Sequence, residues 1–173
     1  MIDDQRYILE QVLMMIRDQG IEALLLAGDI YDRSVPSEEA VQLLDYFLCQ
    51  LSEIGVDTFI ISGNHDSEER LHFGSRLFET NHVYISAKYD GNIYKKECQD
   101  EFGKINIYLL PFIKASQVKY FYPEEKIESY EDAVRVALGH TDIDTSERNI
   151  LVAHQFVAGK SADPQVGGSE GAA

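Results

Sequence analysis

Near the middle of the chain stands Phe59-Ile60-Ile61-Ser62-Gly63-Asn64-His65-Asp66, an apolar run that ends at a glycine and is followed by an amide, an imidazole and a carboxylate. The apolar part predicts a buried β-strand, because strands covered on both faces consist of nearly continuous apolar residues. Gly63 predicts a sharp turn, so the three polar residues lie in a loop at the carboxyl end of the strand. Open α/β sheets bind ligands at that edge, which makes this loop the first candidate site.

Two further apolar runs end in the same way. They are residues 24–27, followed by Gly28-Asp29-Ile30-Tyr31-Asp32, and residues 150–153, followed by His154. We expect Asp29, Asn64 and His154 to converge on one edge of one sheet. Taken singly, a Gly-Asp pair is an ordinary turn and a His at a strand end is often a hydrogen-bonded core residue. Three such ends together favour a site for divalent metal ions, which take carboxylate, amide and imidazole ligands.

Helical periodicity precedes each of the first two strands. Apolar side chains recur at helical spacing over residues 3–19 and 37–54, where Ser37 is the expected N-cap and Gly55 the expected stop. A strand is expected over residues 22–27. The order helix, strand, helix, strand is typical of an α/β protein whose two site strands run parallel.

Further along the chain the periodicity changes. Residues 83–85, 92–94 and 105–109 alternate with a period of two, which predicts antiparallel strands of a second sheet. Ser129 is the expected N-cap of a helix that has Asp132 as its capping-box acid and runs to residue 138, with Gly139 just beyond its end. The aromatic residues 120–122 are assigned mainly to packing, with base stacking as the alternative.

Composition indicates a single globular domain of 173 residues, of which 45% are hydrophobic. No apolar stretch approaches the ~20 residues of a membrane span and nothing resembles a secretion signal, so we expect no membrane association and a cytoplasmic location. Cys49 and Cys98 are expected to be inert thiols. The net charge of −15 disfavours non-specific attraction to nucleic acid, although a charge total does not describe a local cleft.

Three motifs resemble those of the calcineurin-like metallophosphoesterases in order and spacing. They are Gly28-Asp29-x-x-Asp32, Gly63-Asn64-His65-Asp66 and Val152-Ala153-His154-Gln155. Residues 28–36, 73–76, 109–112 and 152–156 are also similar to the bacterial DNA-repair nucleases of this family. The resemblance implies an α/β fold in which a two-sheet β-sandwich is flanked by helices, in four layers ordered α/β/β/α.

The resemblance also implies roles for individual residues. It assigns Asp29, Asn64 and His154 to metal binding, with Asp29 bridging two ions that are usually manganese. It assigns catalysis to His65, which contacts the scissile phosphate, and to Asp66, which would orient His65. Asp32 would support the metal ligands from outside. On the predicted helix over residues 68–79, Arg70 and Arg76 either contact DNA phosphates or form a solvated face.

The function implied is metal-dependent hydrolysis of DNA, as a double-strand exonuclease and single-strand endonuclease in repair and recombination. The implied partners are DNA, an ATPase subunit and a second copy of the chain. Two open alternatives are a phosphoesterase acting on phosphoproteins or nucleotides, and an inactive module for dimerisation or docking.

The family pattern has an Asp-x-His motif before the first helix and a Gly-x-His motif after the third site strand, and this sequence contains neither. We therefore expect residues 1–158 to form an incomplete phosphoesterase domain and residues 159–173 to form a loop or a disordered end. We also expect weak metal binding and slow cleavage by the chain alone.

Overall fold

The structure is a computed structural model that describes residues 2–156. The predicted loop or disordered end at residues 159–173 lies outside the described residues. The helices and strands follow one another as α1 (Ile2–Gln19), β1 (Ala23–Ala27), α2 (Glu38–Ile54), β2 (Asp57–Ile61), α3 (Glu68–His72), α4 (Ser75–Glu79), β3 (Val83–Ser86), β4 (Tyr94–Asp100), β5 (Gly103–Leu110), α5 (Ala115–Phe121), α6 (Tyr130–Gly139) and β6 (Arg148–Ala153).

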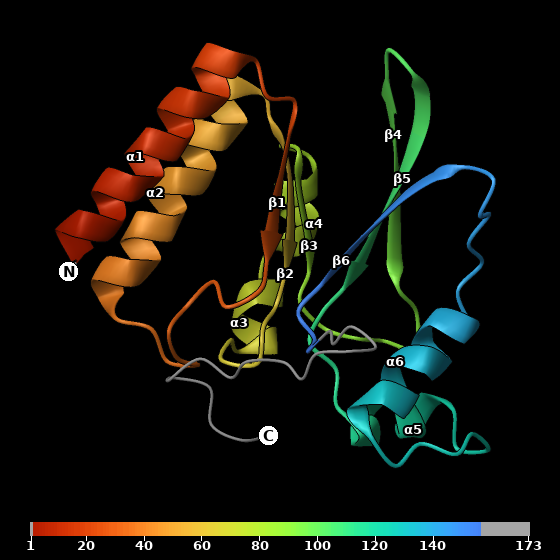
Figure 1. The fold of residues 1–173 in the computed structure, drawn as a ribbon. Coiled ribbons are helices and arrows are strands. Elements are labelled where there is room, and N and C mark those ends of the chain that lie inside the picture. The colour runs from red at the N-terminus through yellow and green to blue at the C-terminus, as the bar shows by residue number, and fades with distance from the viewer. Residues whose placement is uncertain (1, 157–173) are drawn as a thin grey trace, which may run out of the picture.

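The first sheet has the order β1-β2-β3, and all three strands are parallel. Leu26 pairs with Ile60, which in turn pairs with Ile85. Helices α1 and α2 lie side by side on the outer face of this sheet, at the left of Figure 1. The prediction of parallel site strands connected through helices is confirmed for β1 and β2.

The second sheet has the order β4-β5-β6. Strand β4 is antiparallel to β5, as predicted, whereas β6 is parallel to β5. Two predictions about sheet membership were wrong. Residues 83–86 form β3 of the first sheet, because the connection through α3 and α4 returns the chain parallel to β2. The strand that precedes His154 belongs to the second sheet and not to the sheet of Asp29 and Asn64.

The two sheets pack face to face through a shared apolar core. Phe59, Ile61 and Tyr84 of the first sheet meet Ile107, Leu109 and Val152 of the second. The rings of Phe59 and Tyr84 stack with their centroids 5.0 Å apart. This core confirms the predicted β-sandwich.

Two further apolar clusters attach the helices to the sheets. Leu13, Phe47 and Leu51 of α1 and α2 pack with Leu24 and Leu26 of β1. Helices α5 and α6, at the lower right of Figure 1, pack against the opposite face of β5 through a cluster that contains Tyr108, Leu110, Val118 and Val136. The sandwich is therefore flanked by helices on both sides, as the resemblance implied.

The capping residues predicted from the sequence agree with the structure at three helix ends and differ at one. The Ser37 side chain accepts a hydrogen bond from the backbone N–H of Ala40 at 3.2 Å, and Gly55 ends α2 with φ 84°, as predicted. Ser129 and Asp132 form the predicted capping box of α6. Gly139, however, is the last residue of that helix, and His140 caps it.

Two predicted elements differ in extent. The single helix predicted over residues 68–79 divides into α3 and α4 at Gly74, whose φ of 77° is incompatible with a continuous helix. The strand predicted at residues 92–94 begins only at Tyr94, because Asn92 belongs to a turn closed by the carboxylate of Asp90. Within residues 2–156, no helix combines the length and apolarity needed to cross a bilayer.

Candidate metal centre

The three predicted metal ligands meet at the carboxyl ends of strands from both sheets. Asp29 follows β1, Asn64 follows β2 and His154 follows β6. Atom Nε2 of His154 lies 3.1 Å from Oδ1 of Asn64 and 3.5 Å from Oδ1 of Asp29. The residues converge as expected, but they do so across the sandwich and not along one sheet.

The ring of His154 is held with Nε2 facing these two oxygens. Its Nδ1 lies 2.7 Å from the carbonyl oxygen of Ala27. A carbonyl oxygen only accepts hydrogen bonds, so Nδ1 carries the proton of the neutral ring and Nε2 presents its lone pair. In this neutral form Nε2 faces two electron-rich oxygens, and a cation between the three atoms would remove their mutual repulsion.

The spacing of the donors fits a single divalent ion. Adjacent ligands around an ion with bonds of ~2.1 Å lie ~3.0 to 3.4 Å apart, which is close to the distances of 3.1 and 3.5 Å found here. Among the described residues, no group of three or more His, Cys, Asp or Glu gathers in a metal-binding arrangement. The third donor of this centre is instead the amide of Asn64, so the donor set suits one ion and does not by itself hold two.

Two glycines allow this close approach. A Cβ atom at Gly28, where φ is +87°, would overlap the imidazole ring of His154. A Cβ atom at Gly63 would overlap Oδ1 and the backbone nitrogen of Asp29. Asp29 itself adopts the left-handed region with φ 49°, a conformation that costs about 1–3 kcal/mol for a residue other than glycine and is concentrated at functional sites.

The carboxylate of Asp66 joins the loop after β1 to the loop after β2. It accepts hydrogen bonds from the backbone N–H groups of Ile30 at 3.0 Å, Tyr31 at 2.9 Å and Gly63 at 2.8 Å. The prediction that Asp66 orients His65 is therefore wrong, because both of its oxygens are directed to backbone donors. Asp66 instead holds the loop after β1 against the loop after β2.

His65 is oriented by the loop after β1. Its backbone N–H donates to Oδ1 of Asp29 at 3.2 Å, and its Nδ1 lies 3.1 Å from the carbonyl oxygen of Asp32. The carboxylate of Asp32 points elsewhere and pairs with Arg33 at 2.8 Å on the surface. Asp32 therefore contacts the site through its backbone and not through the side chain that the sequence singled out.

Electrostatic effects extend from this centre to its surroundings. Burial raises the pKa of the Tyr31 phenol, the negative charge of Asp66 adds to the shift, and the positive charge of Arg70 opposes it. Arg70 on α3 and Arg76 on α4 follow the loop of Asn64 in the chain. Arg70 and Arg76 are both exposed, so both side chains are accessible to solvent.

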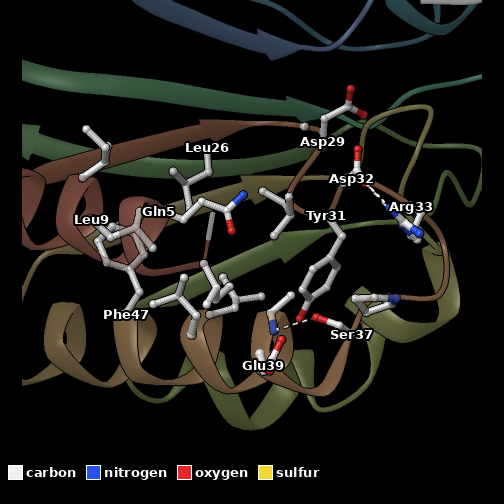
Figure 2. A pocket seen from close by; sticks show the side chains of 18 of the residues that line it. Gln5, Leu9, Leu26, Asp29, Tyr31, Asp32, Arg33, Ser37, Glu39 and Phe47 are labelled. Atoms are coloured by element: carbon white, nitrogen blue, oxygen red, sulfur yellow. Dashed lines mark hydrogen bonds and ion pairs between the residues drawn. The ribbon is translucent and has the colours of Figure 1, made fainter. Parts of the chain in front are cut away.

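A groove of about 1100 Å³ opens along β1 between α1 and α2 and ends at this centre. Figure 2 shows Leu9, Leu26 and Phe47 along its apolar part, with Asp29 and Asp32 at the other end. Sequence patterns did not predict the groove. They included Gln155 in the motif around His154 but gave it no role, although its amide nitrogen is buried.

Comparison with known proteins agrees with this architecture. Residues 2–162 match the family model of the calcineurin-like phosphoesterases. The chain is 35% identical over 162 residues to the D subunit of the SbcCD nuclease of Staphylococcus saprophyticus, an alignment that covers 92% of this chain and 42% of that protein. It is 34% identical over 169 residues to the corresponding protein of Staphylococcus epidermidis, covering 95% and 44%.

The chain thus spans less than half of the length of these curated relatives. The similarity inferred from the sequence motifs is confirmed as homology to the D subunit of the SbcCD nuclease. Because the family match covers all of the described residues, the chain belongs to the calcineurin-like phosphoesterase family.

Proposed function

We propose that this protein hydrolyses DNA phosphodiester bonds with divalent metal ions, as the phosphoesterase part of an SbcD-like nuclease. The observation that carries the proposal is the convergence of Asn64 Oδ1 and Asp29 Oδ1 on His154 Nε2, at 3.1 and 3.5 Å. Residues 1–158 would then belong to the phosphoesterase domain. The similarity to the D subunit of the SbcCD nuclease supports DNA as the substrate class.

The proposed cofactor is manganese. Asp29, Asn64 and His154 would hold one ion, and in the two-ion arrangement of the family Asp29 would also contribute to the second. When bound, such ions supply positive charge to the phosphoryl oxygens and make water a better nucleophile at neutral pH. The hydrogen bond from His154 Nδ1 to the Ala27 carbonyl keeps Nε2 available for the ion.

His65 is the proposed catalytic acid. Because its Nδ1 faces the carbonyl oxygen of Asp32 at 3.1 Å, the proton of the neutral ring lies on Nδ1. The other nitrogen, Nε2, is then the atom that exchanges a proton with the substrate. In the imidazolium form Nε2 donates a hydrogen bond to the scissile phosphate and its proton to the leaving oxygen. Asp66 preserves this arrangement indirectly, by holding the two loops together.

DNA binding would use local positive charge on a chain that is acidic as a whole. Arg70 and Arg76 are the proposed contacts to the phosphate backbone, because both are accessible on the short helices that follow the loop of Asn64. The proposed partners are the SbcC ATPase subunit and a second copy of the chain, acting in DNA repair and recombination. This assignment agrees with the cytoplasmic location expected from the sequence.

The proposal is tested by measuring the cleavage of linear duplex DNA, single-stranded circular DNA and a phosphomonoester by the purified protein with Mn²⁺. His65→Ala should bind Mn²⁺ with unchanged affinity and lower DNA cleavage by about a hundredfold or more, as expected for loss of general acid catalysis. Asp29→Ala should lose both Mn²⁺ binding and DNA cleavage. His140→Ala is the matched control, since its imidazole lies at the end of α6 beside Glu125.

Cleavage of the phosphomonoester and of neither DNA substrate would mean that the protein is a phosphomonoesterase and not a nuclease. An inactive chain that still dimerises would instead support the docking module. Equal loss of Mn²⁺ by His65→Ala and Asp29→Ala would mean that His65 is a ligand.

A further inference from the structure

A second, smaller pocket lies directly beside the metal centre. Its volume is about 180 Å³, and it is lined by Asn64, Phe112, Ala153, His154, Gln155 and Phe156. Two of these residues, Asn64 and His154, belong to the proposed metal ligands. A group in this pocket is therefore adjacent to a phosphate bound at the centre.

One residue of the pocket lining, Gln155, carries a polar donor without a partner. Atom Nε2 of Gln155 is buried, and within residues 2–156 nothing accepts a hydrogen bond from it. An unpaired buried amide is unfavourable, so a protein retains one where a bound molecule supplies the acceptor. The acceptor that fits is an uncharged or anionic oxygen, because Nε2 only donates.

The other walls are aromatic and firmly placed. The backbone N–H of Phe112 donates to the Ser62 carbonyl oxygen at 2.9 Å, which fixes this segment to the end of β2. The Phe112 ring meets the His154 ring edge to face, with centroids 6.4 Å apart. Phe156 also lines the pocket and is 52% exposed, so its ring is accessible to an incoming planar group.

From these observations we propose that the pocket receives the nucleoside adjoining the scissile phosphate, with Gln155 Nε2 donating to an oxygen of its base or sugar and Phe156 stacking on its base. The volume is below the roughly 300–1,000 Å³ typical of sites for drug-sized ligands, so it accommodates one nucleoside ring system and not a dinucleotide. The inference rests on the proposed function, because it takes the neighbouring phosphate to be that of a nucleic acid.

The test is calorimetric titration of the Mn²⁺-loaded protein with thymidine 5′-monophosphate, thymidine and inorganic phosphate. The wild type should bind the nucleotide about tenfold more tightly than phosphate, and free thymidine only weakly. Gln155→Leu and Phe156→Ala should each weaken nucleotide binding about tenfold and leave phosphate binding unchanged. Gln42→Leu is the control, since Gln42 pairs with Glu38 on the surface of α2. Titration of each variant with Mn²⁺ alone should give the wild-type affinity.

Equal affinities of the wild type for nucleotide and phosphate would overturn the inference. Equal weakening of nucleotide and phosphate by Gln155→Leu would also overturn it, because Gln155 would then act only through the metal ligands. DNA cleavage without a preference for the nucleotide over phosphate would support the nuclease proposal and refute the nucleoside pocket. A preference for the nucleotide that depends on Gln155, without any DNA cleavage, would support the nucleoside pocket and refute the nuclease proposal.

Discussion

Replacement of Gly28 by alanine separates the cost of backbone strain from the cost of disturbing the metal centre. Gly28 has φ +87°, and a Cβ atom at this position would overlap the imidazole ring of His154. Gly55 has nearly the same φ, +84°, but nothing lies within 4 Å of an added Cβ atom. Gly55→Ala is therefore a matched control that carries the backbone cost alone.

The magnitudes of the two effects differ. Each substitution places alanine in the left-handed region, which costs about 1–2 kcal/mol of folding free energy. In Gly28→Ala the ring of His154 must also move, which breaks its 2.7 Å hydrogen bond to the Ala27 carbonyl oxygen. That bond contributes about 1 kcal/mol and orients the ligand, and the loss of such orienting contacts typically lowers metal affinity about 10- to 100-fold.

The assay combines Mn²⁺ titration by calorimetry with urea unfolding of both variants. We expect Gly55→Ala to lose about 1–2 kcal/mol of stability and keep its Mn²⁺ affinity. Gly28→Ala should be destabilised somewhat more and lose about tenfold or more in Mn²⁺ affinity. Equal Mn²⁺ affinities in the two variants would refute the argument, because His154 would then not be a ligand or its position would not depend on Gly28.

Further substitutions probe the supports of the site and of the fold. Asp66→Ala should lower the free energy of unfolding by about 3 kcal/mol and weaken Mn²⁺ binding, since three backbone N–H groups lose their acceptor; unchanged metal affinity would contradict its role in joining the loops. Leu109 lies in the core between the sheets, and Leu51 packs with α1, α2 and β1; both side chains are 0% exposed. Replacing either by alanine should lower the free energy of unfolding by about 2–5 kcal/mol, but only Leu109→Ala should weaken Mn²⁺ binding. Ser129→Ala should cost about 1 kcal/mol by loss of its cap and leave Mn²⁺ affinity unchanged. The salt bridge to Arg135 and hydrogen bonds from Glu128 and Ser129 lower the pKa of Asp132 to about 2. The stabilisation from its ionised carboxylate is therefore present above the unfolded pKa of about 3.9 and is lost as the pH falls toward 2. In urea unfolding, the loss of unfolding free energy caused by Asp132→Ala should shrink over that pH interval, and a constant loss would contradict this linkage.

Much of the fold could be predicted because local signals agreed with the final packing. The last three residues of the strand before Gly63, Phe59–Ile61, are apolar, and the structure buries them. The caps of α2 and α6 depend on residues three or four positions apart, so a pattern in the sequence is sufficient to place them. The donors at the strand ends could be found for the same reason, since each lies only a few residues beyond the end of its strand.

Sheet membership could not be predicted from periodicity, because β3 and β6 are placed by pairing with distant segments. Strand β6 pairs with β5 through Val152 and Leu109, residues far apart in the chain. The role of Asp66 was missed for a related reason. Its partners Ile30 and Tyr31 are 36 and 35 positions away, and a backbone N–H group gives no signal in the sequence.

The distribution of the donors over two sheets gives the inter-sheet core a function as well as a structural role. Asp29 and Asn64 are fixed to each other by parallel strands and by the carboxylate of Asp66, whereas His154 reaches them from β6. The ring of His154 is set by the Ala27 carbonyl of the opposite sheet, so the ligand and the contact that orients it come from different layers. Any change in the spacing of the sheets moves His154 relative to both of the other donors and to the carbonyl that orients its ring. We therefore expect the proposed metal centre to depend on the packing of Phe59 and Leu109 between the sheets, although neither of these residues would supply a donor atom to it.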